Sequence, residues 1–494
     1  MPRGHEEAVP RGALRILHNA ITQTWRSRSK SGINRFDIDV SRHVAMLEYG
    51  ASILDRLRQS VCRQLLLCAA QGMMQVQRAR LSLIHSSFRH SSPCGLIVTR
   101  RSVTHDLRPL TMGPKVKISY LVHDLSDPAV HRRTRMLKAG GACVRLAGFR
   151  RTAQHVERVE DCETIDLGET RDGALLARIA SVASVAIRLK RLESVMRGSQ
   201  VVLARNLEML FLATKARRRY APDAALVYEC LDIHRLLLGR SLPSQLLQSI
   251  EHDLMREVDL VLTSSPRFIT EYFSFRKFDP PIKLFENKPL LLDFGMARQP
   301  SLPSGPPWKL GWFGMIRCRR SFAILSAVAR ELGGNLQIRI AGRASPKEFP
   351  DFEKLVARSP HVTFTGSYRF EELPELYGGV HFSWAIDFFE QGLNSSWLLP
   401  NRIYESSLFG AIPIAEEGVE TARWLTEKGI GVILSGDPKT SLLSFLSGLT
   451  SRRYRQLARA LQKIPTAELA MTEESCSEIL KEFGAASDSV RGRL

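Results

Sequence analysis

The stretch KVKISYLVHDLSDPAVHRRTRMLKAGG, residues 115–141, sets the pattern for most of the chain. Its first part is a short apolar run typical of a buried strand. Its second part has the composition of a helix, which ends at Gly140 and Gly141. Asp127 before Pro128 is typical of the residue that caps such a helix. A strand followed at once by a helix is the unit from which parallel sheets are built.

The same alternation of apolar runs and amphipathic segments continues up to residue 287. Because each strand leads into a helix and then into another strand, the strands are expected to lie parallel in a doubly wound sheet. The strands are predicted at 117–124, 143–151, 201–206, 225–232, 260–265 and 282–287. The helices are predicted at 128–141, 174–196, 207–221, 244–258 and 266–273.

A proline-rich stretch then interrupts the pattern. QPSLPSGPPW, residues 299–308, holds four prolines together with Gly and Ser, which is typical of a linker. The alternation restarts after it, so a second α/β domain is expected there. Its strands are predicted at 309–314, 336–342, 362–366, 380–386, 411–415 and 431–435, and its helices at 321–332, 352–359, 371–379 and 400–410.

The sequence therefore predicts the α/β class, with two Rossmann-like parallel-sheet domains that face each other across a cleft. The last helical segments, 451–464 and 474–484, have no strands of their own and are expected to pack across the outside. The predicted boundaries are an N-terminal domain at 112–298, the linker at 299–308, a C-terminal domain at 309–465 and a helical tail at 466–494.

Residues 1–111 differ from the rest of the chain. They hold 17 Lys and Arg against 7 Asp and Glu, which is half of the net charge of +20, and no strand–helix alternation develops. We expect an Arg-rich, poorly ordered extension that is not part of the catalytic unit, or sequence upstream of a true start at Met112. A membrane-binding or partner-binding arm is the alternative.

A net charge of +20 admits three kinds of partner: nucleic acid, an anionic membrane surface or a phosphate-bearing substrate. Basic and aromatic residues are not interleaved, and no zinc-finger or basic-zipper spacing occurs, so no nucleic acid partner is expected. The eight cysteines form no C-x-x-C pair and no metal-ligand spacing, which favours a reducing compartment and no metal site. Without a long apolar run or a secretory signal, the chain is expected to be cytoplasmic.

The start of each domain argues against a dinucleotide oxidoreductase, the first enzyme class that two such domains suggest. That class needs G-x-G-x-x-G between the first strand and the first helix. This chain has HDLSDP at 123–128 and GWFGMIRCRR at 311–320 instead. It also lacks a P-loop, a G-x-S-x-G elbow and an H-E-x-x-H motif, and no cofactor is expected.

The second domain carries a candidate phosphate site. Gly314 ends a predicted strand, and Arg317, Arg319 and Arg320 stand before the next helix. A helix N-terminus favours an anion, and guanidinium groups bind phosphate oxygens in pairs. This combination suits the diphosphate of a nucleotide sugar, whereas solvated surface arginines are the alternative.

Downstream, the stretch NSSWLLPNRIYESSLFGAIPIA, residues 394–415, offers the other half of such a site. Asn401 after a proline suits a helix start, Glu405 lies about one turn in, and Gly410 ends the helix before a strand. A carboxylate there can accept both hydroxyls of a ribose, and an exposed helix glutamate is the alternative. The preceding loop is expected to offer backbone N–H groups to phosphate; it consists of Asn394, Ser395 and Ser396.

These segments together resemble a known family. Residues 112 to about 465 are similar to GT-B-fold, GT4-type retaining glycosyltransferases of bacterial surface-polysaccharide synthesis, and most of all to exopolysaccharide glycosyltransferases of the succinoglycan type. The resemblance implies a C-terminal domain that binds a nucleotide sugar and an N-terminal domain that binds the acceptor. It is carried by YLVHDLSDPAVHRRTRML, LARNLEML, LVYECLDIHRLLLG, LTSSPRFI, GWFGMIRCRRSF and LPNRIYESSLFGAIPIA.

The resemblance also implies roles for single residues. Arg320 matches the family's basic residue and Arg317 is its partner, so both are predicted to act on the diphosphate in catalysis. Glu405 matches the second glutamate of the family's E-x7-E element, which holds the ribose. The chain departs from the family at Trp397, which stands where the first glutamate is expected.

Without that glutamate, two acidic residues further upstream, Asp387 and Glu390, are candidates for the contact to the donor sugar. In the N-terminal domain, Asp232 follows a predicted strand and is a candidate catalytic residue, with a turn cap as the alternative. Other polar residues near strand ends are candidates for the acceptor side of the cleft: His123, Asp124, Arg205, Asn206, Glu229 and His234.

The expected reaction is transfer of a hexose from a nucleotide sugar, expected to be UDP-linked, to a saccharide or lipid-linked acceptor, with retention and without a metal ion. Residues 112–494 contain no D-x-D motif, which agrees. Alternatives are an epimerase or phosphorylase on the same fold, a non-catalytic protein that binds a saccharide or lipid intermediate, and a nucleic-acid-binding protein. Basic residues in 178–197 and 215–219 would rest on the anionic inner-membrane surface if the acceptor is lipid-linked.

Overall fold

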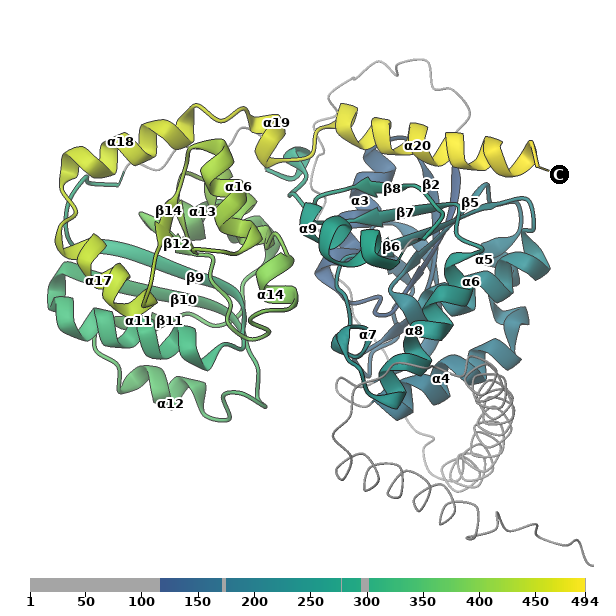
Figure 1. Ribbon diagram of the computed structural model, residues 1–494, viewed down its shortest axis with the longest axis horizontal. Coiled ribbons are helices and arrows are strands. Elements are labelled where there is room, and N and C mark those ends of the chain that lie inside the picture. Colours follow the sequence, from purple (N-terminus) through teal and green to yellow (C-terminus); the bar gives the residue numbers. More distant parts are fainter. Residues whose placement is uncertain (1–115, 171–174, 277, 295–301, 494) are drawn as a thin grey trace, which may run out of the picture. The chain divides into compact units, whose positions relative to one another are not determined.

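The computed structural model describes residues 116–170, 175–276, 278–294 and 302–493. The predicted extension of residues 1–111 lies outside the described residues, and so does the beginning of the predicted linker. The ribbon drawing shows one sheet formed by the strands up to β8 and another formed by the strands from β9 onwards (Figure 1).

Eight strands form the first sheet in this part of the chain, in the order β3-β4-β2-β1-β5-β6-β7-β8. All neighbouring strands in it pair in parallel except β3 and β4, which are antiparallel. The strands are β1 (Lys117–Val122), β2 (Cys143–Arg150), β3 (Arg158–Val159), β4 (Cys162–Glu169), β5 (Val201–Arg205), β6 (Ala225–Cys230), β7 (Leu260–Thr263) and β8 (Ile282–Leu284).

Most of the helices that follow these strands carry a stripe of apolar residues that packs against the sheet, whereas α10 has no buried residue. They are α3 (Pro128–Ala139), α4 (Leu175–Ile187), α5 (Glu193–Met196), α6 (Leu207–Tyr220), α7 (Arg235–Leu238), α8 (Leu242–Met255), α9 (Pro266–Phe268) and α10 (Ser274–Arg276). As predicted, Asp127 caps α3 by accepting a hydrogen bond from the Ala129 N–H, and the helix ends at Gly140.

Two local predictions in this domain were wrong. The single helix predicted at 174–196 is divided into α4, a 3-10 turn and α5, and in the turn Arg191 donates to the backbone oxygens of Asp166 and Leu167. Strands β3 and β4 were not predicted. They lie at the edge of the sheet, where polar residues exposed to solvent interrupt the apolar run.

The second sheet has six strands within the described residues, all parallel, in the order β11-β10-β9-β12-β13-β14. Together with the first sheet it confirms the predicted α/β class with two parallel-sheet domains. The strands are β9 (Trp308–Ile316), β10 (Leu336–Ala344), β11 (Val362–Phe364), β12 (Phe382–Trp384), β13 (Ile412–Glu416) and β14 (Val432–Leu434).

Helices that cover the second sheet include the predicted helix around Glu405, which begins at Asn401 and ends before Gly410. The helices of this part are α11 (Arg319–Leu332), α12 (Phe352–Ala357), α13 (Leu373–Gly378), α14 (Asn394–Trp397), α15 (Asn401–Leu408), α16 (Glu420–Lys428), α17 (Pro438–Ser447) and α18 (Ser451–Gln462).

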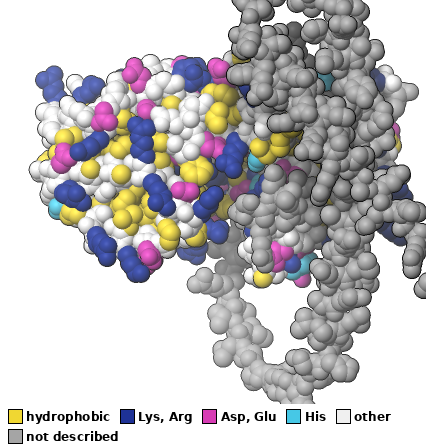
Figure 2. All heavy atoms as spheres, turned by 60° about the horizontal axis from the view of Figure 1, so that its bottom comes forward, with side chains coloured by type: hydrophobic (Ala, Val, Ile, Leu, Met, Phe, Trp, Pro, Cys, Tyr) yellow, Lys and Arg dark blue, Asp and Glu magenta, His cyan; other side chains and the backbone are white. Residues whose placement is uncertain are grey.

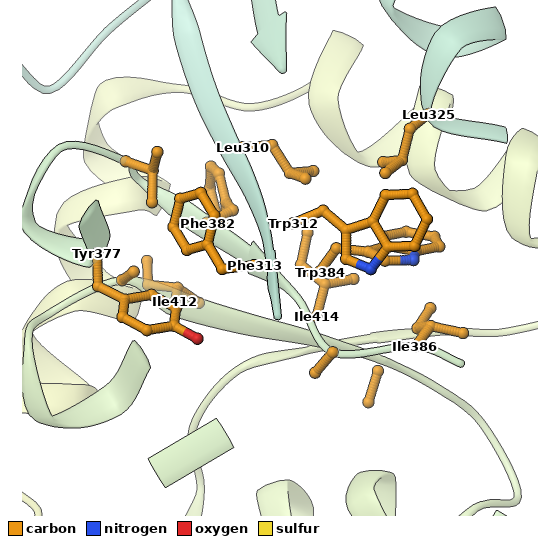
Figure 3. Packing of buried hydrophobic residues seen from close by; sticks show 14 of the residues in the cluster. Leu310, Trp312, Phe313, Leu325, Tyr377, Phe382, Trp384, Ile386, Ile412 and Ile414 are labelled. Carbon is orange, nitrogen blue, oxygen red and sulfur yellow. The ribbon is translucent and has the colours of Figure 1, made fainter. Parts of the chain in front are cut away.

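The core of the second sheet is rich in aromatic rings. Figure 3 shows Trp312 and Phe313, neighbours on β9, pointing to opposite sides of the strand, Trp312 towards Leu325 of α11 and Phe313 towards Tyr377 of α13. The rings of Phe313 and Tyr377 meet edge to face, with their centroids 5.0 Å apart. Both faces of β9 are therefore buried, as expected for a central strand of a parallel sheet.

The last helices cross from one domain to the other, which confirms the expected outside packing. After α18 and the short α19 (Thr466–Leu469), helix α20 (Glu473–Arg491) contacts α3 and β6 of the first domain (Figure 1). Its Cys476, Leu480 and Phe483 are buried in the core of that domain. The approach is close at Gly140, where an added Cβ would lie 2.6 Å from the Cys476 oxygen.

Charged side chains are dispersed on the one face of the molecule that can be seen in Figure 2. On the face that Figure 2 shows, Lys and Arg over the elements β9 to α18, on the left, alternate with acidic and apolar side chains instead of forming one basic stripe. None of the helices in the described ranges combines the length and the apolar composition needed to span a bilayer.

Candidate active site

A cleft of about 420 Å³ lies where the carboxyl ends of strands from both sheets meet in the described part of the chain. His123 follows β1, Asn206 follows β5 and Gly314 lies near the end of β9. This is the place that parallel sheets provide for ligands. Four arginines and five carboxylates line the cleft: Arg132, Arg205, Arg317 and Arg402, with Asp127, Asp232, Asp387, Glu405 and Glu416.

The cleft brings together most of the residues predicted from the sequence, although they come from distant parts of the chain. Predicted residues that line it are His123, Arg205, Asn206, Asp232, Gly314, Arg317, Asp387, Ser395, Asn401 and Glu405. Predicted residues that do not line it are Asp124, Glu229, His234, Arg320, Asn394 and Ser396.

Glu229 is absent from the cleft because it is buried completely inside the N-terminal domain. Its carboxylate accepts hydrogen bonds from Arg133 Nε at 2.5 Å, Arg205 Nε at 2.8 Å and the Tyr120 hydroxyl at 2.6 Å. Burial acts to raise the pKa of Glu229, but Arg205 and Arg133 outweigh it and hold this pKa at about 2. Glu229 therefore supports Arg205, which does reach the cleft.

Arg320, predicted as catalytic, lies outside the cleft in this structure. Its exposed guanidinium donates to Gln391 Oε1 at 2.8 Å and lies over the ring of Phe388, 4.1 Å from the centroid. Arg317, three residues earlier, faces the cleft and pairs with Asp387, with 3.1 Å between Nη2 and Oδ2. Of the two predicted phosphate ligands, Arg317 is the one that lines the cleft.

The remaining predicted residues outside the cleft have local partners. Asp124 accepts from the backbone N–H and the hydroxyl of Ser126, and His234 caps α7 through the Leu236 N–H. Asn394 donates to the backbone oxygen of Ile233 at 2.7 Å and accepts from its N–H at 3.2 Å, so it ties α14 to the chain beside Asp232. Ser396 accepts from the Gly392 N–H.

Gly314 has the backbone conformation that its place in the cleft requires. Its φ of +112° lies in a region that side chains with a Cβ rarely adopt. An added Cβ would point towards Arg402 Nη2 and the Tyr368 hydroxyl, at 3.9 and 4.0 Å. The glycine therefore leaves the backbone of β9 open to a ligand between these two groups.

Glu405 is 5% exposed and belongs to α15, one turn from the helix start, as predicted. Arg132 of α3 donates to its Oε1 at 3.2 Å, and the Tyr377 hydroxyl donates to its Oε2 at 3.3 Å. The expectation of an exposed helix glutamate is excluded by this burial. A buried carboxylate with two donors and a face on a cleft is suited to bind hydroxyl groups.

Trp397 stands where the family has the first glutamate of its E-x7-E element, and in this structure it has a packing role. Its side chain packs against the hydrophobic core of the N-terminal domain, and its backbone oxygen accepts from the hydroxyl of Ser265. Of the two acidic candidates upstream, Asp387 lines the cleft and pairs with Arg317, whereas Glu390 does not line it. The residue that replaces the glutamate, Trp397, therefore contributes to the contact between the two domains.

On the N-terminal side, Asp232 is exposed to solvent, but desolvation by the surrounding cleft residues raises its pKa to about 6, with Arg317 acting against this shift and Glu390 in the same direction. The carboxylate is accessible from the cleft, but the cleft walls crowd it. Burial also lowers the pKa of His123, and Asn206 Nδ2 lies 3.3 Å from its Nδ1. His123 is thus a neutral ring near pH 7, with Nδ1 as the acceptor.

Several cleft residues were not predicted. Arg132 lies in a helix rich in arginine, and nothing in its spacing distinguishes it from Arg133, which enters the core. Arg402 donates to the Trp384 backbone oxygen at 3.3 Å, a contact that its position in the sequence does not reveal. The other unpredicted polar residues are Asp127, expected as a helix cap alone, with Ser264, Asn287, Tyr368, Glu416 and Thr421. Among the described residues, no three His, Cys, Asp or Glu side chains group together in a way that would hold a metal ion.

Known proteins share sequence or fold with this chain. No protein-family model matches the chain. The chain is 42% identical over 375 residues to succinoglycan biosynthesis protein ExoL of Rhizobium meliloti (strain 1021), a match that covers 74% of this chain and 93% of that protein. The predicted resemblance to proteins of succinoglycan-type synthesis is confirmed.

Solved structures share the fold at low sequence identity. Sucrose-phosphate synthase from Thermosynechococcus elongatus aligns with a TM-score of 0.58 at 13% identity, over 75% of this chain and 98% of that one. Anabaena Alr3699/HepE in complex with UDP and glucose aligns with a TM-score of 0.54 at 14% identity, over 75% of this chain and all of that one. Both have the GT-B fold, so the predicted fold is confirmed.

Proposed function

This chain belongs to the family of succinoglycan biosynthesis protein ExoL and has the GT-B glycosyltransferase fold, and from this we propose that it transfers a hexose from a nucleotide sugar to a saccharide or lipid-linked acceptor in exopolysaccharide synthesis. The observation that carries the proposal is the joint cleft. Glu405 and Arg317 of the C-terminal domain line it together with Asp232 of the N-terminal domain.

The nucleotide sugar would lie against the C-terminal domain. Its ribose hydroxyls would donate to Glu405, and its diphosphate would lie beside Gly314, with Arg317 as the counter-charge. We propose a UDP-linked donor, a choice supported by the UDP complex of the Anabaena protein with the same fold. Asp387, held beside Arg317, would contact the sugar in place of the glutamate that Trp397 replaces.

Glycosyl transfer builds negative charge on the leaving diphosphate while the sugar becomes oxocarbenium-like. A fixed positive charge beside the leaving diphosphate oxygen lowers the activation barrier of the transfer, because the charged group need not reorganise during the reaction. Arg317, and Arg402 across Gly314, are positioned for this role. We propose that these guanidiniums neutralise the diphosphate without a metal ion, and unchanged turnover in excess EDTA would support that.

The acceptor would lie against the N-terminal domain, near His123, Asn206 and Asp232. We propose front-face attack with retention, as the GT4-type resemblance implies, with the ionised Asp232 orienting the acceptor hydroxyl. The anomeric coupling constant of the product would report retention or inversion directly.

We also propose that the chain works at the cytoplasmic face of a membrane. Ile187 is 59% exposed at the end of α4, near the exposed Lys190, and both α4 and the following 3-10 turn contact α6, where Lys215 and Arg219 are exposed. Vesicle flotation should show binding that needs phosphatidylglycerol and falls with salt. Equal binding to pure phosphatidylcholine vesicles would count against it.

Thermal unfolding of the full chain with UDP-, GDP- and dTDP-sugars tests the proposed function. At a ligand concentration 100 times the Kd, the right donor adds about 2.7 kcal/mol to the free energy of unfolding, because it binds the folded state alone. Glu405→Gln should cost about tenfold in this affinity, since a neutral amide accepts the ribose hydroxyls less well. If none of the donors raises the Tm, the chain is not a nucleotide-sugar enzyme of this kind.

Activity should depend on the ionisation of Asp232. Because the pKa of this carboxyl is raised to about 6, it is ionised above that pH and neutral below it. Turnover is expected to fall as the pH decreases from 7.5 to 5, and Asp232→Asn should be weakly active with that limb flattened. Asp223→Asn, an exposed loop carboxylate outside the cleft, is the control and should keep the limb. An unchanged pH profile in Asp232→Asn would exclude this role.

A further inference from the structure

Glu405 is held by a residue of the opposite domain. Arg132, on α3 of the N-terminal domain, donates from Nη2 to Glu405 Oε1 at 3.2 Å, and each of the two side chains is 7% exposed. Tyr377, from the C-terminal domain, donates to the other carboxylate oxygen at 3.3 Å. The carboxylate is therefore fixed at both oxygens before any ligand is bound.

Each oxygen of an ionised carboxylate has two acceptor positions. Arg132 occupies one position on Oε1 and Tyr377 one position on Oε2, which leaves one further position on each oxygen of this cleft-lining carboxylate. Two neighbouring acceptors of this kind match a pair of adjacent hydroxyls, as on a ribose. We infer that Arg132 is a positioning residue for the nucleotide ribose, an inference that rests on the proposed function.

Arg132 itself is anchored from both domains. Its Nη1 lies 3.4 Å from the backbone oxygen of Asn287, and, with the Asn401 amide oriented to satisfy both of its ends, 2.9 Å from the Asn401 oxygen. Its guanidinium also lies over the ring of Phe370, 5.1 Å from the centroid. The affinity for the ribose thus depends on the N-terminal domain, although the carboxylate that binds it belongs to the other domain.

A residue that supports the fold alone would affect every nucleotide equally, whereas a positioning residue for the ribose acts through its hydroxyls. Calorimetric titration of the full chain with UDP and with 2′,3′-dideoxyuridine diphosphate separates the two roles. We expect Arg132→Met to weaken UDP binding about tenfold and to leave dideoxy binding unchanged within twofold. Arg132→Lys, which restores one donor, should recover part of the loss.

Arg135→Met is the matched control. Arg135 is on the same helix and also lies 5.1 Å from the centroid of the Phe370 ring, but it pairs with Asp293 and Glu160 rather than with Glu405. It should leave both affinities unchanged. The inference would be overturned if Arg132→Met weakened the binding of both nucleotides equally, or weakened neither. If the methionine variant does not fold, Arg132→Lys is compared with wild type in the same way. A wild-type chain that binds neither UDP, GDP nor dTDP would overturn the proposed function instead, and the inference with it.

Discussion

Glu229→Gln is expected to lower the free energy of unfolding by about 3–5 kcal/mol, the usual cost of removing one partner from a buried ion pair. Arg133 and Arg205, at 0% and 2% exposure, would lose the charge that compensates them. Urea unfolding followed by circular dichroism measures the change. Since Arg205 also lines the cleft, the variant should lose activity even where it remains folded.

The pH dependence of this loss follows from the lowered pKa of Glu229. A carboxyl with a pKa of about 2 in the folded chain and of about 4.5 when unfolded stabilises the fold fully above the higher value. That contribution disappears as the pH falls towards 2, so the difference between wild type and Glu229→Gln should shrink over this range. Glu482→Gln, which breaks the exposed pair with Lys283, is the matched control and should cost about 1 kcal/mol or less. Equal losses in the two variants would contradict the account.

Arg317→Ala should reduce the rate of sugar transfer about 100- to 1000-fold, because it removes a fixed positive charge from the place where the diphosphate leaves. The fold should survive, since the Arg317 side chain is 37% exposed and its partner Asp387 can be solvated from the cleft. The measurement is kcat with saturating donor, together with the Tm of the variant.

Two neighbouring arginines serve as controls. Arg319 pairs with Glu348 and Arg320 donates to Gln391, and neither lines the cleft. Arg319→Ala should keep most of the activity. Arg320→Ala tests the assignment further, since the family resemblance assigns both arginines to catalysis whereas Arg317 alone of the two lines the cleft. A larger loss in Arg320→Ala than in Arg317→Ala would mean that the cleft changes shape before the reaction.

Much of the fold could be predicted because the local sequence patterns agree with the secondary structure that the tertiary fold requires. Buried parallel strands such as β5 and β6 read as continuous apolar runs, and Gly140 and Gly410 end their helices. The predicted secondary structure was wrong where tertiary contacts determine whether a segment forms a strand or a helix. The edge strands β3 and β4 carry polar residues, and the break after α4 depends on bonds from Arg191 to distant backbone oxygens.

Some of the site residues could likewise be predicted from the sequence, and others could not. Gly314 and Glu405 stand at strand and helix ends with recognisable turn chemistry, so their place in the cleft could be predicted. Which arginine of a cluster turns inwards depends on packing between domains that are far apart in sequence. Arg132 meets Glu405 and Arg133 meets Glu229, and no spacing rule separates these neighbours. The prediction that Glu229 lines the cleft was wrong. Its position at the end of a strand does not reveal that buried arginines surround it.

The central claim is that the joint cleft transfers a sugar from a nucleotide donor. The most direct test incubates the full chain with radiolabelled donor and with lipid-linked saccharides extracted from the cells that make it, then measures label in the lipid phase. We predict labelled lipid with wild type, at least 100-fold less with Arg317→Ala, and near wild-type label with Arg319→Ala. Tight donor binding without label in any lipid-linked or free saccharide product would contradict the claim and identify a binding protein instead.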